Sequence, residues 1–460
     1  MSSITRYLMR FVKSIVTRET FRSEFIANLL LLLAIVFAFI PIKYVLSGYT
    51  ENILGRYSDF TAISVYLSLI FVVGLGLWTI YSWWTDPPSN SVLKFIGLFI
   101  AIALLYITFL PQEQTSLGIY SLTKIACGVL VGYHVYKSEI TLKYKDFLLW
   151  TIVGLGAINA VIALIQFGVQ SSIGLNLIGE SPLSILGWEI AKSVAHGTTF
   201  IRSYGLFPHA NILGAVLVII SLLNLYLINK STQYLHHVGL FVTFCLISAG
   251  IFASQSRAAL LSMGVSYLIY GSMILIRDKV NIILKLTPIV VWLVILLILF
   301  FPWLSNRTTL TDTAVAERVV LAETTAHSIA DNWLLGTGPG TNLIMLHGKL
   351  QNTMDHWLIQ PVHNYLLINI SDFGLVGFIT IILILFLFIK QIISSVKGRY
   401  TDHTWSFTLS SICIAIFILF WFDHYFYTYW PAQLLLAVIL GLIARELRQP
   451  KRSENRGVQN

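Results

Sequence analysis

Three side chains that lie far apart in the chain have the types needed for transfer chemistry on a phosphorylated substrate. Arg202 and Arg257 could together bind a diphosphate, because planar guanidinium groups bind phosphoryl oxygens in pairs and stabilise charge on a leaving group. His363 could accept a proton from a hydroxyl, because an unperturbed imidazole has a pKa of about 6.5. Together they would suit transfer of a group from a lipid diphosphate to a hydroxyl acceptor.

Each of these residues also has a simpler interpretation. An arginine at a membrane surface is commonly an anchor whose charge reaches the interface, and a histidine can simply begin a helix. Sequence spacing does not show whether the three residues meet. Which interpretation holds depends on the structural elements that carry these residues.

The composition predicts an all-α fold embedded in a membrane. The 460 residues are 56% hydrophobic and 11% charged, and the mean hydropathy is +0.78. Such a chain has too few charges to cover a soluble domain. Apolar runs of about 17 to 25 residues, each able to cross the hydrocarbon layer as a helix, recur along it. The twelve predicted spans are 25–46, 61–82, 92–110, 117–136, 147–168, 208–229, 236–254, 258–276, 282–301, 364–389, 406–422 and 432–446.

The basic residues predict the orientation of these spans. With the N-terminus inside, 21 of the 30 Lys and Arg residues fall on the cytoplasmic side and seven fall outside. Lys43 and Lys124 fall within predicted spans. Both termini are therefore expected in the cytoplasm of a multi-pass inner-membrane protein. The net charge of +9 is attributed to this topology, and no nucleic-acid partner is expected.

Three parts of the chain follow from this topology. Residues 1–24 are expected to form a cytoplasmic amphipathic helix with no cleavable signal peptide, residues 25–446 the transmembrane domain, and residues 447–460 a basic tail. The segment 302–363 is the one large extracytoplasmic loop. Cys127, Cys245 and Cys413 fall inside spans without metal or redox spacing and are expected to pack among apolar side chains.

The large loop is predicted to contain a helix over residues 313–330. Asp312 is its candidate N-cap, and Val315, Val319, Ala322, Ala326 and Ile329 form its apolar stripe. Asn332 to Gly340 is glycine-rich, but it follows no strand, so we expect a structural turn rather than a nucleotide site.

A continuous helix is expected from Asn364 onward. It would place Gly374 about three turns below His363 on nearly the same face. The smooth face through Gly374 and Gly377 could then admit a lipid tail or a closely packed helix.

Three further features near the outer face could contribute to a functional site. A short re-entrant or interfacial helix is expected around Pro182–Ala195. Lys124 lies inside the fourth span near its outer end, where it either reaches the surface or serves as counter-ion for an anionic ligand. The aromatic connection Phe422–Pro431 suits an aromatic belt or stacking on a sugar, and Asp423 is its candidate chemical residue.

Several motifs resemble those of the O-antigen ligase family. His363-Asn364, followed after nine residues by Gly374, is similar to the family's signature after its largest periplasmic loop. Gly205 to Asn211 resembles the segment entering a span, although Ala210 replaces the usual proline after His209. Ser256-Arg257-Ala258 resembles the Ser-Arg turn, and Arg318 with Trp333 to Gly340 resembles the loop helix and its glycine-rich end.

This resemblance implies an all-helical enzyme that moves a glycan from undecaprenyl diphosphate to an acceptor without nucleotide or metal. Arg202 and Arg257 would hold the diphosphate, and His363 would assist the acceptor hydroxyl. Substrate-binding roles are also expected for three residues of the motifs, Asn364, Arg318 and His209. We add Lys124 and Asp423 because each carries a charge near the outer face. No cofactor or metal is expected, since the outer segments contain no Asp-x-Asp or clustered His, Asp and Glu.

Two functional alternatives remain open. A polymerase of O-antigen, capsule or exopolysaccharide would use the same motifs, but its acceptor would be the growing lipid-linked chain. A secondary transporter would instead predict paired broken helices near the midplane and a repeat between the two halves. The partners expected for the enzyme are a lipid-diphosphate-linked glycan, a glycan or lipid acceptor, and membrane lipids.

Overall fold

The computed structural model describes residues 19–47, 60–84, 87–138, 144–187, 190–195, 197–277, 281–305, 313–355, 358–398 and 402–448. The amphipathic segment predicted before residue 19, the Asp312 cap and the tail beyond residue 448 lie outside these ranges.

The described residues form an all-α fold with two small hairpins. Each of the twelve predicted runs contains a helix: α2 (Glu19–Phe39), α4 (Leu67–Ser82), α5 (Asn90–Phe109), α6 (Thr115–Lys137), α8 (Lys145–Val169), α9 (Ala210–Lys230), α10 (Tyr234–Ser254), α11 (Arg257–Arg277), α12 (Asn281–Ser305), α15 (Tyr365–Val396), α16 (His403–Phe422) and α18 (Trp430–Arg448). Ten helical segments in the described ranges are long and apolar enough to cross a membrane, while Glu24–Phe39 and Leu67–Ser82 are shorter apolar helices. The prediction of a polytopic membrane protein is confirmed.

The prediction is wrong at the C-terminal end of the first span and at the N-terminal end of the second, where the chain forms strands instead of helix. Residues Lys43–Ser47 form strand β1, which pairs antiparallel with strand β2 (Ile63–Tyr66). Pro41 lacks a backbone donor and favours extended backbone in the residue before it, so α2 ends at Phe39. Lys43 therefore lies on a hairpin strand rather than in a helix.

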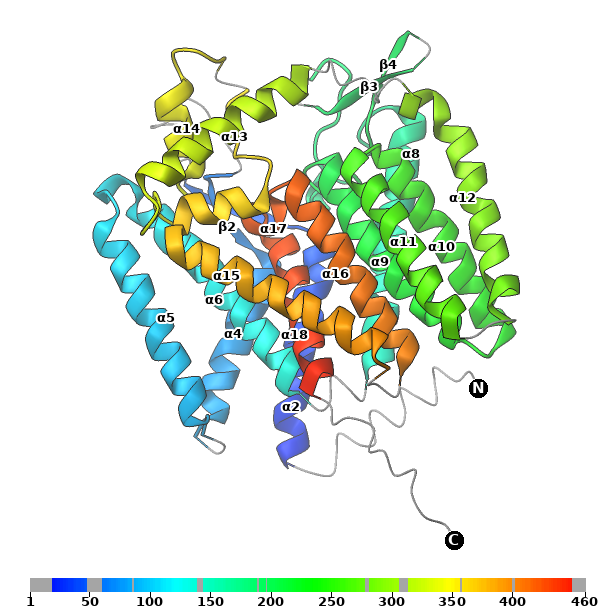
Figure 1. The fold of residues 1–460 in the computed structure, drawn as a ribbon, viewed down its shortest axis with the longest axis horizontal. Helices are drawn as coiled ribbons and strands as arrows, with labels where there is room; N and C mark the ends of the chain where they lie inside the picture. Colours follow the sequence, from blue (N-terminus) through cyan, green and yellow to red (C-terminus); the bar gives the residue numbers. More distant parts are fainter. Residues whose placement is uncertain are drawn as a thin grey trace.

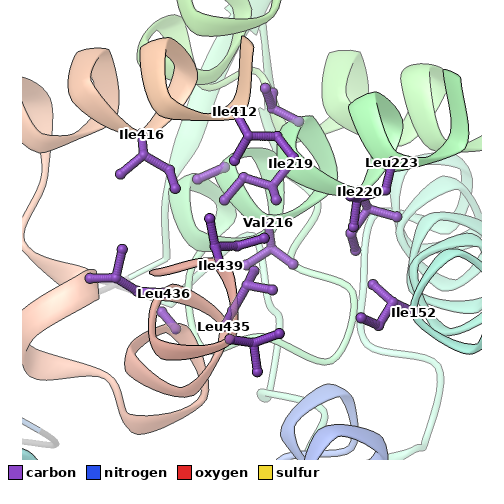
Figure 2. Packing of buried hydrophobic residues seen from close by; sticks show 14 of the residues in the cluster. Ile152, Val216, Ile219, Ile220, Leu223, Ile412, Ile416, Leu435, Leu436 and Ile439 are labelled. Carbon is purple, nitrogen blue, oxygen red and sulfur yellow. The ribbon is translucent and has the colours of Figure 1, made fainter. Parts of the chain in front are cut away.

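Helix α9 is the centre of the apolar core. Every residue from Ala210 to Ile228 is buried, as expected for a helix that is apolar on all faces. It packs against α8, α10, α11 and α16. Figure 2 shows its residues Val216, Ile219 and Ile220 among side chains from neighbouring helices, including Ile152, Ile412 and Ile439.

Helix α15 is broken at Gly374, so the prediction of a continuous helix is wrong. Gly374 has φ of 53° and ψ of −129°, which lies outside helical geometry and favours glycine. The break exposes carbonyl groups of the first half-helix. Ser371 and Asp372 accept from the Thr337 and Gly338 amides at 2.8 and 3.0 Å.

The glycine-rich loop fills the face that the sequence left open beside Gly374. A Cβ at Gly374 would lie 2.6 Å from the Gly336 nitrogen and from the Leu334 carbonyl. Gly336, Gly338 and Gly340 all have positive φ, so the loop needs glycine to follow this path. The segment is a structural turn, as predicted. The occupant of the smooth face is this loop, not a lipid tail or another helix.

The large loop contains two helices, α13 (Thr313–Asp331) and α14 (Asn342–Leu350). The first confirms the predicted helix, but the predicted stripe is wrong, because Val319 is 48% exposed and Leu321 is 1% exposed. Leu321 packs with Leu343, Leu346 and Leu350 of α14, which the sequence analysis did not predict. The buried face of α13 was set by this neighbour and not by the apolar pattern.

The helix predicted around Pro182–Ala195 is absent from its described residues. Lys192–Ala195 instead forms strand β3, paired antiparallel with strand β4 (Thr198–Ile201). The preceding loop is organised by the buried Glu180, whose carboxylate accepts from the Ile173 and Leu175 amides and from the Gln166 side chain. Backbone donors bound to a carboxylate favour this loop over a helix.

Candidate functional site

The connections predicted to lie outside gather at one end of the bundle. Figure 1 shows β3, β4, α13 and α14 at the same end, beyond the helices. The short helix α17 (Tyr425–Thr428), between α16 and α18, also lies toward this end. Side chains from α13, from the segments before α9 and α15 and from the segment after α16 interact in this part of the molecule.

A buried hydrogen-bond network joins Arg202 to Asp423 through Asn211. The Arg202 guanidinium donates to Asn211 Oδ1 at 2.5 Å, and Asn211 Nδ2 donates to Asp423 Oδ2 at 2.9 Å. All three side chains are buried, with exposed fractions of 5%, 8% and 5%. Buried charges need such partners, so this network fixes the guanidinium and carboxylate relative to each other.

Arg202 and Arg257 are both attached to the α10–α11 turn. Arg202 Nε donates to the Ser254 carbonyl at 2.9 Å, at the C-terminal end of α10, where a cation is favoured. Gln255 then adopts a left-handed φ of 49°, and Arg257 begins α11 after one further residue. This tight reversal places the half-buried Arg257 close to the segment that Arg202 binds.

His363 lies directly before α15, in a position fixed by the helix cap. Asn364 is the N-cap, and its Oδ1 accepts from the Leu366 and Leu367 amides, each at 2.9 Å. Its Nδ2 donates to the Trp421 carbonyl at 3.2 Å. Both polar ends of Asn364 thus support the fold and orient His363. The substrate-binding role expected for Asn364 stays a prediction.

A second histidine, His424, faces His363. Their ring centroids are 5.2 Å apart at an interplanar angle of 71°. His424 Nδ1 is 2.8 Å from Thr428 Oγ1, and its backbone amide donates to Asp423 Oδ1 at 2.9 Å. The aromatic connection predicted at Phe422–Pro431 therefore supplies Asp423 and His424 to the same site.

Burial keeps these histidines neutral. It lowers the pKa of His363 to about 3 against the opposing charge of Asp423, and the charge of Arg318 adds to the decrease. Burial and the charge of Arg202 lower the pKa of His209 to about 3. His209 caps α9, and its Nδ1 accepts from the Asn211 amide at 3.1 Å.

Asp423 remains ionised in this surrounding. Burial opposes its charge, but the charge of Arg318 and, when they are protonated, those of His424 and His363 hold the pKa of its carboxyl below the usual value. Arg318 on α13 acts electrostatically on His209, His363, Asp423 and His424 alike. The predicted residues Arg202, His209, Arg318, His363 and Asp423 are thus brought together.

Three side chains of this site have the spacing of metal ligands. Ligand atoms of His363, Asp423 and His424 lie within 4.8 Å of one another. The expectation that the outer segments contain no such cluster is wrong, because it forms only when the start of α15 meets the end of α16. Both Asp423 oxygens already accept hydrogen bonds, from Asn211 and from the His424 amide. The set is therefore built into the protein's own network, and metal independence stays a prediction.

Lys124 lies in a neighbouring pocket rather than among the arginines. It is 6% exposed, its Nζ lies 3.4 Å from the Thr428 carbonyl, and the pocket is also lined by Asp372 and Tyr427. Snorkelling to the surface does not describe this position.

Three residues of the region were missed as site candidates: Asn211, Asp372 and His424. Asp372 had a usable signal, since a carboxylate within an apolar run is rare without a function or partner. His424 directly follows Asp423, and Asn211 ends the motif that contains His209. What the sequence lacked was the contact that joins the two motifs.

The comparison with family models gives one match. Residues 240–382 match the model described as O-antigen ligase, a range that contains Arg257, Arg318 and His363. No curated protein matches the chain significantly.

Proposed function

We propose, from the match of residues 240–382 to the O-antigen ligase model, that the chain transfers a glycan from a polyprenyl diphosphate donor to an acceptor hydroxyl. The family supports a membrane glycosyltransferase of the ligase or polymerase type in general. The observation that carries the finer proposal is the meeting of Arg202, Arg318 and Asp423 with the neutral His363 in one buried site. We place this site at the outer face of the cytoplasmic membrane, from the distribution of basic residues.

His363 acts as the base in this proposal. Its Nδ1 is buried without a hydrogen-bond partner among the described residues. A neutral ring can accept the proton of the acceptor hydroxyl as the oxygen attacks the anomeric carbon. The new glycosidic C–O bond forms while the bond from the anomeric carbon to the diphosphate oxygen breaks. The reaction proceeds by in-line displacement with inversion, and the diphosphate leaves with the bonding electron pair.

The arginines stabilise the leaving diphosphate. Arg257 and Arg318 are half-buried, and Arg202 is fixed by Ser254 and Asn211. Charges that are already oriented stabilise a developing anion without reorganisation at the moment of reaction. Burial is the larger cause of the lowered pKa of His363, and the charge of Arg318 adds to it. Donor binding would neutralise Arg318 and should therefore make His363 more basic.

The transporter alternative loses its structural support at the broken helix. A transporter would use the freed carbonyl groups of a broken helix to bind an ion or substrate. Here the carbonyls of Ser371, Asp372 and Phe373 accept from Thr337, Gly338 and the Tyr106 hydroxyl. The break in α15 positions a loop, and these three carbonyls are occupied by the protein itself.

The test is transfer by the His363→Ala variant in membranes that contain labelled lipid-linked glycan. We expect a decrease of about 10²-fold or more, the usual contribution of a general base. His327→Ala is the matched control, because His327 is exposed on α13, and it should keep full activity. Unchanged transfer by a folded His363→Ala protein contradicts the catalytic assignment.

The product distinguishes the ligase from the polymerase. One glycan chain on a new acceptor identifies a ligase, whereas a longer chain on the same lipid identifies a polymerase. Both enzymes would use the same site, so the measurement identifies the acceptor and does not change the role proposed for His363.

A further inference from the structure

We propose that a pocket beside His363 and His424 binds a sugar ring of the acceptor. The pocket is lined by Phe60, Ser121, Lys124, Asp372, Tyr427 and Gln433, among others, and is called the Asp372 pocket below. This inference rests on the proposed function and adds to it the chemical class and position of one substrate.

The Asp372 pocket contains acceptors that the protein leaves without donors. Asp372 is fully buried, and its Oδ2 accepts from the Tyr427 hydroxyl at 2.5 Å and the Gly340 amide at 2.8 Å. Its Oδ1 and Gln433 Oε1 have no hydrogen-bond partner of ordinary geometry in the described part of the chain, although the Asn342 backbone amide acts on the Asp372 carboxylate. Buried acceptors without partners are costly, so the pocket suits a ligand that donates hydrogen bonds.

The charges of the pocket favour a neutral ligand. Among the described residues, the Lys124 ammonium donates only a long hydrogen bond to the Thr428 carbonyl, and it lies 4.6 Å from the centroid of the Tyr120 ring. It lies close enough to act electrostatically on Asp372, yet the two form no ion pair within the described ranges. A donor and an acceptor that line the same pocket without pairing match neighbouring hydroxyl groups better than a diphosphate. Lys124 is therefore reassigned from counter-ion of an anionic ligand to donor for a sugar hydroxyl.

Aromatic side chains complete the match to a sugar. The rings of Phe60 and Tyr427 line the pocket, and Phe60 is 39% exposed. Aromatic rings offer apolar surface to the C–H groups of a sugar, while its hydroxyls reach Asp372, Gln433 and Lys124.

The pocket is connected to the proposed base through His424. Thr428 lines the pocket, and its Oγ1 is 2.8 Å from His424 Nδ1. The Phe60 ring meets the His424 ring at 5.2 Å, and the same distance separates the rings of His424 and His363. A hydroxyl of a sugar bound here is thus close to the histidine pair.

The arginine network approaches the histidine pair through other elements. Arg202 reaches Asp423 through Asn211 of α9, whereas the helices that line the pocket are α6, α14, α15, α17 and α18. Figure 1 shows α6 on one side of the bundle and α9 and α11 on the other, with α17 between them, while α15 crosses from the side of α6 toward α16. In-line displacement requires the nucleophile and the leaving group on opposite sides of the anomeric carbon. With the diphosphate at the arginines, the Asp372 pocket receives the acceptor and not the donor.

The test measures binding and kinetics of Asp372→Asn and Lys124→Met. Saturation-transfer NMR of the purified protein with octyl glucoside, octyl galactoside and octyl N-acetylglucosaminide reports sugar binding without turnover, in a detergent that carries no sugar. We expect signal from at least one glycoside with the wild type and with His363→Ala, and a loss of about tenfold or more in affinity for each pocket variant. Asp331→Asn, at the exposed end of α13, is the matched control and should bind as the wild type does.

The kinetic arm separates the two substrates. In transfer from a short-chain polyprenyl diphosphate glycan to the glycoside that binds, each pocket variant should raise KM for the acceptor about tenfold and leave KM for the donor within about twofold. Wild-type glycoside binding by both variants, or a rise confined to the donor KM, overturns the proposal. Glycoside binding that depends on Asp372 in a protein without transferase activity supports the pocket and refutes only the proposed function. Lys124→Met keeps the test decisive if Asp372→Asn does not fold.

Discussion

Two polar regions meet at His363, and they differ in how their polar atoms are used. On the α9 side, Asn211 bonds to both Arg202 and Asp423, and both carboxylate oxygens of Asp423 accept hydrogen bonds. On the α15 side, one oxygen of Asp372 is bound by Tyr427 and Gly340, and the other has no hydrogen-bond partner of ordinary geometry among the described residues. A network that is closed on itself holds geometry, whereas a network with an open acceptor is prepared for a ligand.

The comparison assigns different substrates to the two regions. Fixed cations suit an anionic group that must be stabilised as it leaves, so the α9 side suits the diphosphate. Open acceptors beside an ammonium suit a hydroxylated ring, so the α15 side suits the acceptor. The following predictions test this division from the largest expected effect to the smallest.

The largest effect in this set is expected from Arg257→Lys. A lysine keeps the charge but lacks the planar fork that binds two phosphoryl oxygens, so transfer should fall by about 10²-fold. The measurement is transfer from labelled lipid-linked donor, with KM for the donor. Arg448→Lys, at the end of α18, is the control and should retain activity. Full activity of Arg257→Lys would contradict the assignment of the diphosphate to the α9 side.

Gly374→Ala should disturb the α15 side through the backbone. The substituted Cβ would meet the backbone of Leu334 and Gly336 at 2.6 Å, in a conformation that favours glycine. We expect a loss of about 1–3 kcal/mol in stability, because strain of this kind has that cost. Thermal unfolding in detergent measures it, and Gly264→Ala serves as control because a Cβ there meets nothing within 4 Å. Equal stability of the two variants would contradict the close packing of the glycine-rich loop on α15.

A decrease in stability is expected as the pH falls below neutrality. The pKa values of His363 and His209 are lowered to about 3 in the folded protein, against about 6.5 in an unfolded chain. The unfolded state therefore binds protons first, so the stabilisation present above about pH 6.5 is progressively lost as the pH falls toward 3. Thermal unfolding between pH 8 and pH 4 should show a constant midpoint above neutrality and a falling one below it. Replacing both histidines with glutamine should flatten this slope, whereas His327→Gln should leave it unchanged.

Removal of metal ions is expected to leave the transfer activity unchanged, which is the smallest effect of the set. If the His363, Asp423 and His424 cluster serves only as base and network, prior incubation with EDTA and assay without added cations should leave transfer unchanged. Loss of activity that is restored by a divalent cation would convert the centre between the two regions into a metal site, and His363 from base to ligand.

Much of the fold could be predicted from the sequence, because membrane helices are specified locally. Twelve apolar runs gave twelve helices, since each run must satisfy its own backbone in the hydrocarbon layer. The predictions failed where tertiary contacts outweighed local pattern. Leu321 was buried by α14, and Gly374 was unwound because loop amides replace its helical hydrogen bonds.

The site, like the fold, was predictable where local sequence decides and unpredictable where tertiary contacts decide. Residue types and their side of the membrane identified Arg202, Arg257, His363 and Asp423 as candidates before any contact was known. The resemblance to the O-antigen ligase motifs added Arg318 and His209. Asn211 and His424 were overlooked because their value comes from what they touch.

The sequence by itself determined which side chains could carry charge and protons, and that apolar helices hold them at one end of the bundle. Only the tertiary structure decided that Asn211 links Arg202 to Asp423, that His424 faces His363, and that Asp372 keeps one oxygen open beside them. The physical reason is range. Apolar periodicity acts within one helix, whereas a hydrogen bond between α9 and the end of α16 depends on how all the intervening helices pack.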